Sequence, residues 1–199
     1  MFALATSQPL LFSIIVGYLL GSFPTAVLIS RLRGVDIFAV GSRQAGAANV
    51  SRHVGTAEGV VVFLVDGTKG ALTIGIAYRL GATGEAVLLP AMAALVGHWR
   101  PVFTRFRGGD GVSTLVGITL AVFPVYGLIS VVTALAVALI ARMAGQPVPS
   151  LWGGIAGYGF LILRLPASQE NAALVFGIVL LAIIVLAHGV VGHRRRRAA

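Results

Sequence analysis

The chain has 199 residues, of which 57% are hydrophobic and only 11% are charged, and its formal net charge at pH 7 is +9. A water-soluble domain of this length has one small core, so this much apolar side chain excludes a soluble globular fold and indicates a bilayer as solvent. The absence of cysteine excludes disulfides and thiolate metal sites. The sequence predicts an all-α integral membrane protein, organised as one domain over residues 1–199.

The first apolar segment covers residues 1–30 and contains no charged side chain. A helix needs about 20 apolar residues to cross a bilayer, so this segment is long enough to span it. A cleaved signal peptide would begin with basic residues, whereas the first basic residue here is Arg31, after the apolar segment. We therefore expect a retained span whose N-terminus faces outward.

Five more apolar segments follow, at residues 59–78, 86–97, 111–141, 151–163 and 171–191. The longest of them is interrupted by Pro124 and Gly127, which are typical of a turn, so it predicts two spans and the chain seven. Seven spans place most basic residues on the cytoplasmic side, as the positive-inside rule requires, and predict a cytoplasmic C-terminus. The inward-facing basic residues are then Arg31, Arg33, Arg43, Arg52, Arg100, Arg105, Arg107, Arg142 and residues 194–197.

The predicted cytoplasmic face is strongly basic, which suits contact with anionic lipid headgroups or anionic substrates. Its basic residues are dispersed in short loops beside the spans rather than gathered in one patch. This pattern argues against binding of nucleic acid.

A short loop at residues 41–52 combines glycines with polar and basic side chains. Glycines let the backbone approach an anion, and the donors here are Ser42, Arg43, Asn49 and Arg52. A solvated connection between two spans would have a similar composition. The loop alone therefore leaves both interpretations open.

Asp66 and Lys69 lie inside the second apolar segment. Three residues apart on a helix, they can neutralise each other, so a structural ion pair is one interpretation. Charged residues in a span are costly and often functional, which favours a substrate-binding role for Lys69. A small transporter could use the same two residues, although the chain shows no paired broken helices of the kind found in many transporters.

Residues 97–114 form the most informative stretch of the chain. They combine glycines, arginines and a histidine: Gly108, Gly109, Gly111, Arg105, Arg107 and His98. The glycines precede an apolar helix, so their backbone N–H groups can form an anion cradle at its N-terminus. The arginines add positive charge, and His98 is a candidate proton acceptor at neutral pH. An ordinary basic loop anchored at the membrane interface by Trp99 is the alternative.

Four segments in this order, at residues 21–25, 41–52, 66–70 and 97–114, resemble the acyl-phosphate-dependent glycerol-3-phosphate acyltransferases of bacterial membranes. The resemblance runs through most of the chain. It implies a seven-span enzyme of the inner membrane that transfers a fatty acyl group from acyl phosphate to the 1-hydroxyl of glycerol 3-phosphate. The products are lysophosphatidate and phosphate. It also implies no metal and no cofactor, contact with membrane lipids, and an enzyme that makes acyl phosphate as a candidate partner.

The resemblance assigns the first loop to the phosphate of glycerol 3-phosphate and the glycine cradle to the phosphate of the donor. His98 or His188 would accept the hydroxyl proton. The candidate substrate-binding residues are Ser42, Arg43, Asn49, Arg52, Lys69, Arg107, Gly108, Gly109 and Gly111, and the candidate catalytic residues are His98 and His188.

The chain departs from the family pattern at several polar positions. Arg43, Gln44, Ala48 and Val191 replace Gly, Asn, Thr and Asn, and Arg107 and Asp110 replace two lysines. An acid at position 110 would repel a phosphate, and Arg43 could compensate by pairing with it. Two interpretations follow: an active acyltransferase with a reshaped pocket, or a decayed homologue that binds anionic lipid or supports a partner enzyme.

Overall fold

The computed structural model describes residues 2–164 and 171–197, with side chains over residues 8–164 and 171–190. These residues form helices and connections and contain no strand, which confirms the all-α class. The helices are α1 (Phe2–Ser22), α2 (Thr25–Leu32), α3 (Ala47–His53), α4 (Thr56–Arg79), α5 (Leu88–Trp99), α6 (Val112–Val122), α7 (Pro124–Met143), α8 (Pro149–Arg164) and α9 (Ala172–Arg197), with 3-10 turns η1 (Gly84–Val87) and η2 (Val102–Thr104).

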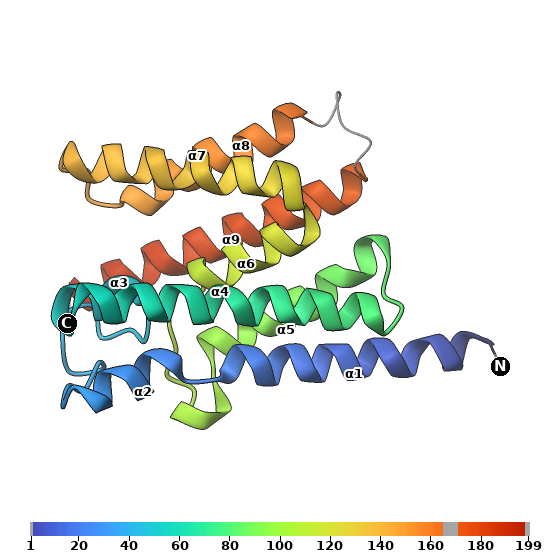
Figure 1. Ribbon diagram of the computed structural model, residues 1–199, viewed down its shortest axis with the longest axis horizontal. Helices are drawn as coiled ribbons and strands as arrows, with labels where there is room; N and C mark the ends of the chain where they lie inside the picture. Colours follow the sequence, from blue (N-terminus) through green and yellow to red (C-terminus); the bar gives the residue numbers. More distant parts are fainter. Residues whose placement is uncertain (1, 165–170, 198–199) are drawn as a thin grey trace.

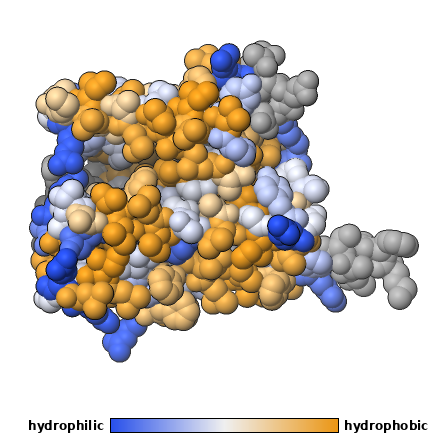
Figure 2. Space-filling view, viewed as in Figure 1, coloured by the Kyte–Doolittle hydropathy of each residue, from blue (hydrophilic) through white to orange (hydrophobic). Residues whose placement is uncertain are grey.

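Much of the helical surface is apolar. Figure 2 shows apolar residues spread over the bundle, and Leu64, Leu139 and Leu180 are each more than half exposed. Lipid tails tolerate such a surface, whereas water does not. The segments long and apolar enough to cross a membrane are Gln8–Leu32, Thr56–Arg79, Gly84–Thr104, Pro124–Met143 and Ala172–Val190. The other two predicted spans correspond to the shorter α6 and α8, so the count of seven stays a prediction.

The helices run roughly along one long axis (Figure 1). The C-terminus, α3 and the α7–α8 connection lie at one end of the bundle, and the N-terminus lies at the other. The α5–α6 connection is set back from the C-terminal end and lies beside the break between α1 and α2. This arrangement gathers the polar segments singled out in the sequence into one half of the molecule.

The first span is broken into α1 and α2 within the segment 21–25. Proline has no N–H and its ring clashes with the preceding turn, and the helix is interrupted at Phe23 and Pro24. The break leaves the carbonyl of Phe23 without its helical partner. The Lys69 ammonium donates to this carbonyl at 2.8 Å.

Glycines allow α4, α5 and α6 to approach their neighbours closely. A methyl group on Gly21 would overlap the backbone of Ala94 in α5, and one on Gly117 would overlap the backbone of Gly67 in α4. Small residues of this kind permit tight packing of membrane helices. The result is that Lys69 of α4 and His98 of α5 are both buried near the break in the first span.

Two local expectations need correction. Residues 41–52 are not one loop, because the chain turns helical at Ala47 and forms α3. The interruption of the long apolar segment is a single residue, Phe123, rather than a turn over residues 123–127. Proline fits the first turn of a helix, where its missing N–H has no partner to lose, so α7 begins directly at Pro124.

Candidate functional site

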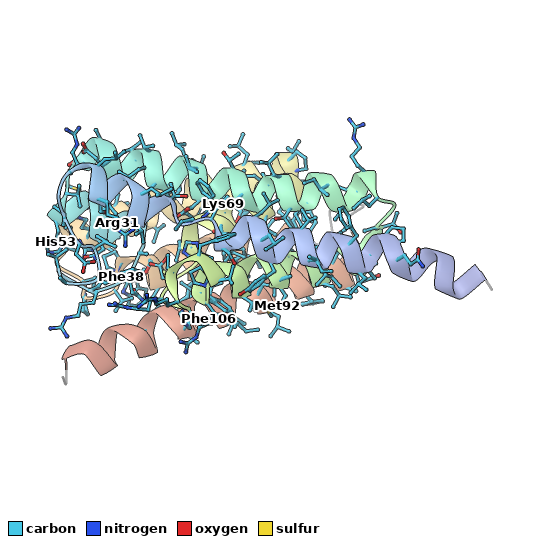
Figure 3. All side chains as sticks on the ribbon, turned by 90° about the horizontal axis from the view of Figure 1, so that it is seen from below. Arg31, Phe38, His53, Lys69, Met92 and Phe106 are labelled. Carbon is cyan, nitrogen blue, oxygen red and sulfur yellow. The ribbon has the colours of Figure 1, made fainter. Side chains whose placement is uncertain are left out.

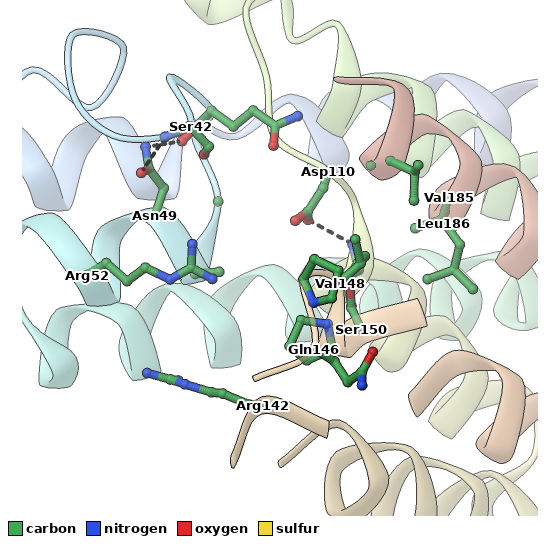
Figure 4. A pocket seen from close by; sticks show the side chains of 18 residues that line it. Ser42, Asn49, Arg52, Asp110, Arg142, Gln146, Val148, Ser150, Val185 and Leu186 are labelled. Atoms are coloured by element: carbon green, nitrogen blue, oxygen red, sulfur yellow. Dashed lines mark hydrogen bonds between the residues drawn. The ribbon is translucent and has the colours of Figure 1, made fainter. Parts of the chain in front are cut away.

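A cleft of about 390 Å³, here called the outer cleft, lies between the α2–α3 loop, the start of α6, the α7–α8 connection and α9. Its polar and charged lining residues are Ser42, Gln44, Asn49, Arg52, Asp110, Arg142, Gln146 and Ser150. Figure 4 shows Arg52 and Arg142 on one side of the cleft and Asp110 on the other. The cleft therefore has a cationic wall facing an anionic one.

Asn49 holds the α2–α3 loop in shape. Its buried amide nitrogen lies within hydrogen-bond distance of the carbonyl oxygens of Ile37, Val40 and Gln44, at 3.2, 3.2 and 3.0 Å. Its side-chain oxygen accepts the backbone N–H of Ser42 at 3.1 Å. These bonds occupy the amide, so the contribution of Asn49 to the cleft is to place the Ser42 side chain on its wall.

Arg43 does not pair with Asp110 as the sequence suggested. The Arg43 N–H donates to Val40 O in a turn at 2.9 Å, and its side chain is exposed and outside the lining of the outer cleft. The ion pairs among the described side chains are Arg33–Glu58 and Asp66–Lys69. The second cation of the cleft is instead Arg142, at the end of α7.

A smaller cavity, here called the inner cavity, lies beside the break in the first span. Its volume of about 20 Å³ has room for about one water. Its lining residues include Phe23, Thr25, Ala45, Asp66, Lys69, His98, Arg107, Gly108 and Gly109. Asp66 and Lys69 form an ion pair, one of the two interpretations of these residues, with the ammonium 2.7 Å from the carboxylate and both side chains buried. Figure 3 shows Lys69 set back along the bundle from Arg31 and His53.

Several buried polar atoms around the inner cavity have no hydrogen-bond partner in the described part of the chain. They are His98 Nε2 and Thr25 Oγ1, in lining residues that are each 5% exposed, and Ser22 Oγ, in a fully buried residue between the lining residues Gly21 and Phe23. The other ring nitrogen of His98 lies 3.3 Å from Thr114 Oγ1. Leaving a buried polar atom unpaired costs about 1–3 kcal/mol. These atoms therefore mark a place that a water or a ligand completes.

The glycine segment separates the two cavities. Gly108 and Gly109 line the inner cavity, and the next residue, Asp110, lines the outer cleft. Ala45 N donates to Gly108 O at 3.2 Å, and Gly109 N donates to His98 O at 3.1 Å. A methyl group on Gly109 would overlap Ala45 O and His98 Nε2. Gly109 is buried, and its lack of a side chain is what lets this segment pack directly against Ala45 and His98.

Gly111 and His188 line neither cavity. Gly111 directly precedes α6 and has a left-handed backbone, with φ of 90°. A methyl group on Gly111 would lie 2.8 Å from the indole nitrogen of Trp99. The His188 ring stacks on Trp99 with centroids 4.9 Å apart. Both residues support Trp99, whose indole N–H donates to Asp110 O at 2.8 Å. The departure at Val191 and the arginines at 194–197 lie outside the residues whose side chains are described.

Arg107 lines the inner cavity at the protein surface. Its guanidinium carbon is 4.2 Å above the ring centroid of Phe38, and the side chain is exposed. A guanidinium is attracted to the face of an aromatic ring, and this contact uses none of its N–H donors in hydrogen bonds, so they stay available to an anion. Arg107 therefore joins the glycines at the inner cavity, as the sequence predicted.

Sequence reasoning missed residues that come from distant segments. Arg142, Gln146 and Ser150 reach the outer cleft from the α7–α8 connection. Ser22 and Thr25, which supply the buried hydroxyls, lie in the segment 21–25 that the sequence had singled out. The expectation that Arg142 lies on the same side as Arg52 was a usable signal. It could not place the two in one cleft, because that depends on how α7 and α8 pack.

An apolar groove of about 440 Å³ runs along the surface between α1 and α4. It is lined by Val16, Leu19, Leu20, Phe23, Val65, Thr68, Lys69, Leu72 and Phe103. Phe23 and Lys69 also line the inner cavity, so the groove ends at the buried polar group. The site thus has an apolar approach from the membrane side and a charged cleft at the end of the bundle.

Comparisons with known proteins agree with one another. The family model described as glycerol-3-phosphate acyltransferase matches residues 11–196. A protein of that name from Rubrobacter xylanophilus is 36% identical over 177 residues, which cover 80% of this chain and 87% of that protein. Glycerol-3-phosphate acyltransferase 1 of Deinococcus radiodurans is 37% identical over 179 residues, covering 89% and 87%. A solved structure is also similar: the crystal structure of PlsY, an integral membrane glycerol 3-phosphate acyltransferase, in its glycerol 3-phosphate form. Its sequence is 32% identical and its TM-score is 0.77, and the match covers 95% of this chain and 90% of the PlsY chain.

Proposed function

Because the chain belongs to the glycerol-3-phosphate acyltransferase family, it is a multi-pass membrane enzyme that acylates glycerol 3-phosphate, and we propose that acyl phosphate is its donor. We also propose that it works in the bacterial inner membrane. Relatives at this identity over most of the chain favour the enzyme over a transporter or a decayed homologue. The geometric observation that carries the proposal is the charged outer cleft beside the inner cavity, with Asp110 and Gly109 as neighbours between them.

The acceptor binds in the outer cleft. Arg52 and Arg142 face the cleft from two different segments, and Ser42 adds a hydroxyl. Guanidinium groups bind phosphate through paired, charge-assisted hydrogen bonds, so two of them on one wall suit the dianionic end of glycerol 3-phosphate. Arg142 supplies the second cation that the sequence had assigned to Arg43.

The donor binds at the inner cavity with its acyl chain in the apolar groove. The groove ends at Lys69, where the ammonium would meet the donor phosphate. The Gly108 backbone lies close by, while the Gly109 N–H already donates to His98 O. Arg107 supplies further charge from the protein surface. Since the cavity has room for about one water, entry of the phosphate requires its lining segments to move apart.

Acyl phosphate is a mixed anhydride and is already activated, so the transfer needs no covalent enzyme intermediate. The 1-hydroxyl oxygen of glycerol 3-phosphate attacks the acyl carbon, the bond from that carbon to the phosphate oxygen breaks, and phosphate leaves. Lys69 and the glycine backbone stabilise the developing charge. His98 Nε2, buried and unpaired in the described chain, is positioned to take the hydroxyl proton. An enzyme that makes acyl phosphate is a candidate partner, because it would deliver this reactive donor directly.

Replacing Arg52 or Arg142 by Ala should raise the KM for glycerol 3-phosphate at least about tenfold, because each change removes a charge-assisted phosphate contact. The KM for the donor should change little. The matched control is Arg31→Ala, an exposed arginine outside the cleft lining, which should behave like the native chain. Unchanged dependence on glycerol 3-phosphate in either cleft variant would remove that residue from the acceptor site.

The donor proposal is tested by lysophosphatidate formation from glycerol 3-phosphate with palmitoyl phosphate or palmitoyl-CoA as the only acyl source. We expect product with palmitoyl phosphate alone. Product from palmitoyl-CoA and none from palmitoyl phosphate would overturn the proposed donor while leaving the acyltransferase activity in place.

A further inference from the structure

The outer cleft is electrically polarised, and so is its proposed ligand. Arg52 and Arg142 lie on one side and Asp110 on the other (Figure 4). Glycerol 3-phosphate has a charged phosphate at one end and neutral hydroxyl groups at the other. A carboxylate repels a phosphate but accepts hydrogen bonds from hydroxyls. The acid that stands where the family has a lysine therefore disfavours only one orientation of the ligand, with the phosphate beside position 110.

Asp110 is held in place and keeps one oxygen available. Its Oδ1 accepts the backbone N–H of Val112 at 3.1 Å, and its backbone carbonyl accepts the indole N–H of Trp99 at 2.8 Å. The described hydrogen bonds do not use Oδ2, and no described arginine or lysine forms an ion pair with this carboxylate. A fixed side chain binds a ligand at little entropic cost.

On the side of the α2–α3 loop, the carboxylate faces Gly46. A Cβ built on this glycine would lie 3.8 Å from Oδ1 and 3.9 Å from Oδ2. Gly46 and Asp110 both line the outer cleft. A side chain at position 46 would therefore contact the acid, whereas glycine leaves this side of the carboxylate facing the cleft.

The position of Asp110 also suits the reaction. It directly follows Gly109, which lines the inner cavity together with His98. A hydroxyl bound at Asp110 therefore lies one residue from the proposed donor cradle and proton acceptor. The arginines, on the opposite wall, would hold the phosphate away from the reacting atoms.

We propose that Asp110 is a positioning and specificity residue that accepts a hydrogen bond from a glycerol hydroxyl of the acceptor and so sets its orientation in the outer cleft. This inference rests on the proposed acceptor site. From the sequence alone, an acid at position 110 is expected to repel the phosphate. Asp110 instead selects the productive orientation of the ligand and does not weaken binding of its phosphate.

The test compares binding of glycerol 3-phosphate and propyl phosphate, which has the same phosphate end and no hydroxyls, to the purified native chain and to Asp110→Asn. Asparagine keeps Oδ1 for the N–H of Val112 and replaces the second oxygen by a donor. We expect about tenfold weaker binding of glycerol 3-phosphate to Asp110→Asn and no weakening for propyl phosphate.

Tighter binding of both ligands to Asp110→Asn would show that the acid only repels phosphate, and unchanged binding of both would reduce Asp110 to a cap of α6. Either result overturns the proposal. If the variant fails to fold, equal affinity of the native chain for the two ligands overturns it instead. Because binding is measured without an acyl donor, these outcomes are independent of whether palmitoyl phosphate is the donor.

Discussion

Replacing Gly109 by Ala lowers acyl transfer about a hundredfold or more, while the protein stays folded in the membrane. The added methyl group would overlap Ala45 O and His98 Nε2, so the segment can keep neither its contact with the α2–α3 loop nor its place beside the histidine. A misplacement of about 1 Å in a reacting site can by itself cost about a hundredfold in rate. The methyl group also covers the backbone that we propose meets the donor phosphate.

The matched control is Gly75→Ala in α4, an exposed glycine around which no atom lies within 4 Å of the added Cβ. It should keep full activity and slightly favour its helix, because alanine has the higher helix propensity. Initial rates and thermal unfolding of both variants in the same lipid make the comparison. Full activity in Gly109→Ala would remove the glycine cradle from the mechanism.

The second large effect concerns the buried Asp66–Lys69 pair, for which the sequence left a structural role and a substrate role open. Lys69→Met alone should destabilise the protein by about 3–5 kcal/mol, because it leaves a buried carboxylate unpaired. The double variant Asp66→Asn/Lys69→Met removes both charges and should recover most of that stability. We expect it to stay about a hundredfold less active, because the cation at the donor phosphate is still missing.

Thermal unfolding and acyl transfer measured together on the native, single and double variants separate the two roles. If activity returns with stability in the double variant, the pair is structural and Lys69 does not bind the donor. If the double variant is stable and inactive, the ammonium acts on the substrate.

Most of the fold followed from local signals in the sequence. The apolar segments predicted the helices, and the spacing of Asp66 and Lys69 indicated an ion pair as one of two interpretations. The short helix α3 was not predicted, because its seven residues carry no apolar periodicity long enough to recognise.

The candidate site was predictable where its residues are neighbours in sequence and unpredictable where they meet through packing. Ser42 and Arg52 line the cleft, but Arg43 between them does not, because the turn at Val40 decides which side chains face it. Arg142 reaches the same cleft from α7, almost a hundred residues later. Asn49 looked like a ligand-binding amide, yet its hydrogen bonds hold the loop.

Asp110 shows most clearly what the three-dimensional arrangement adds. From the sequence, an acid in a phosphate-binding stretch indicates repulsion and loss of function. In the structure, the carboxylate faces the outer cleft opposite two arginines, with one oxygen on the N–H of Val112. The same charge can then orient a substrate whose two ends differ in charge.

The central claim is that this divergent site is a working acyltransferase site. The most direct measurement is lysophosphatidate formation from palmitoyl phosphate and glycerol 3-phosphate by the native chain in lipid, beside Asp110→Lys. We predict product from the native chain and less from Asp110→Lys, because the lysine would draw the phosphate to the wrong end of the cleft. Product from Asp110→Lys with none from the native chain would contradict the account and identify a decayed site.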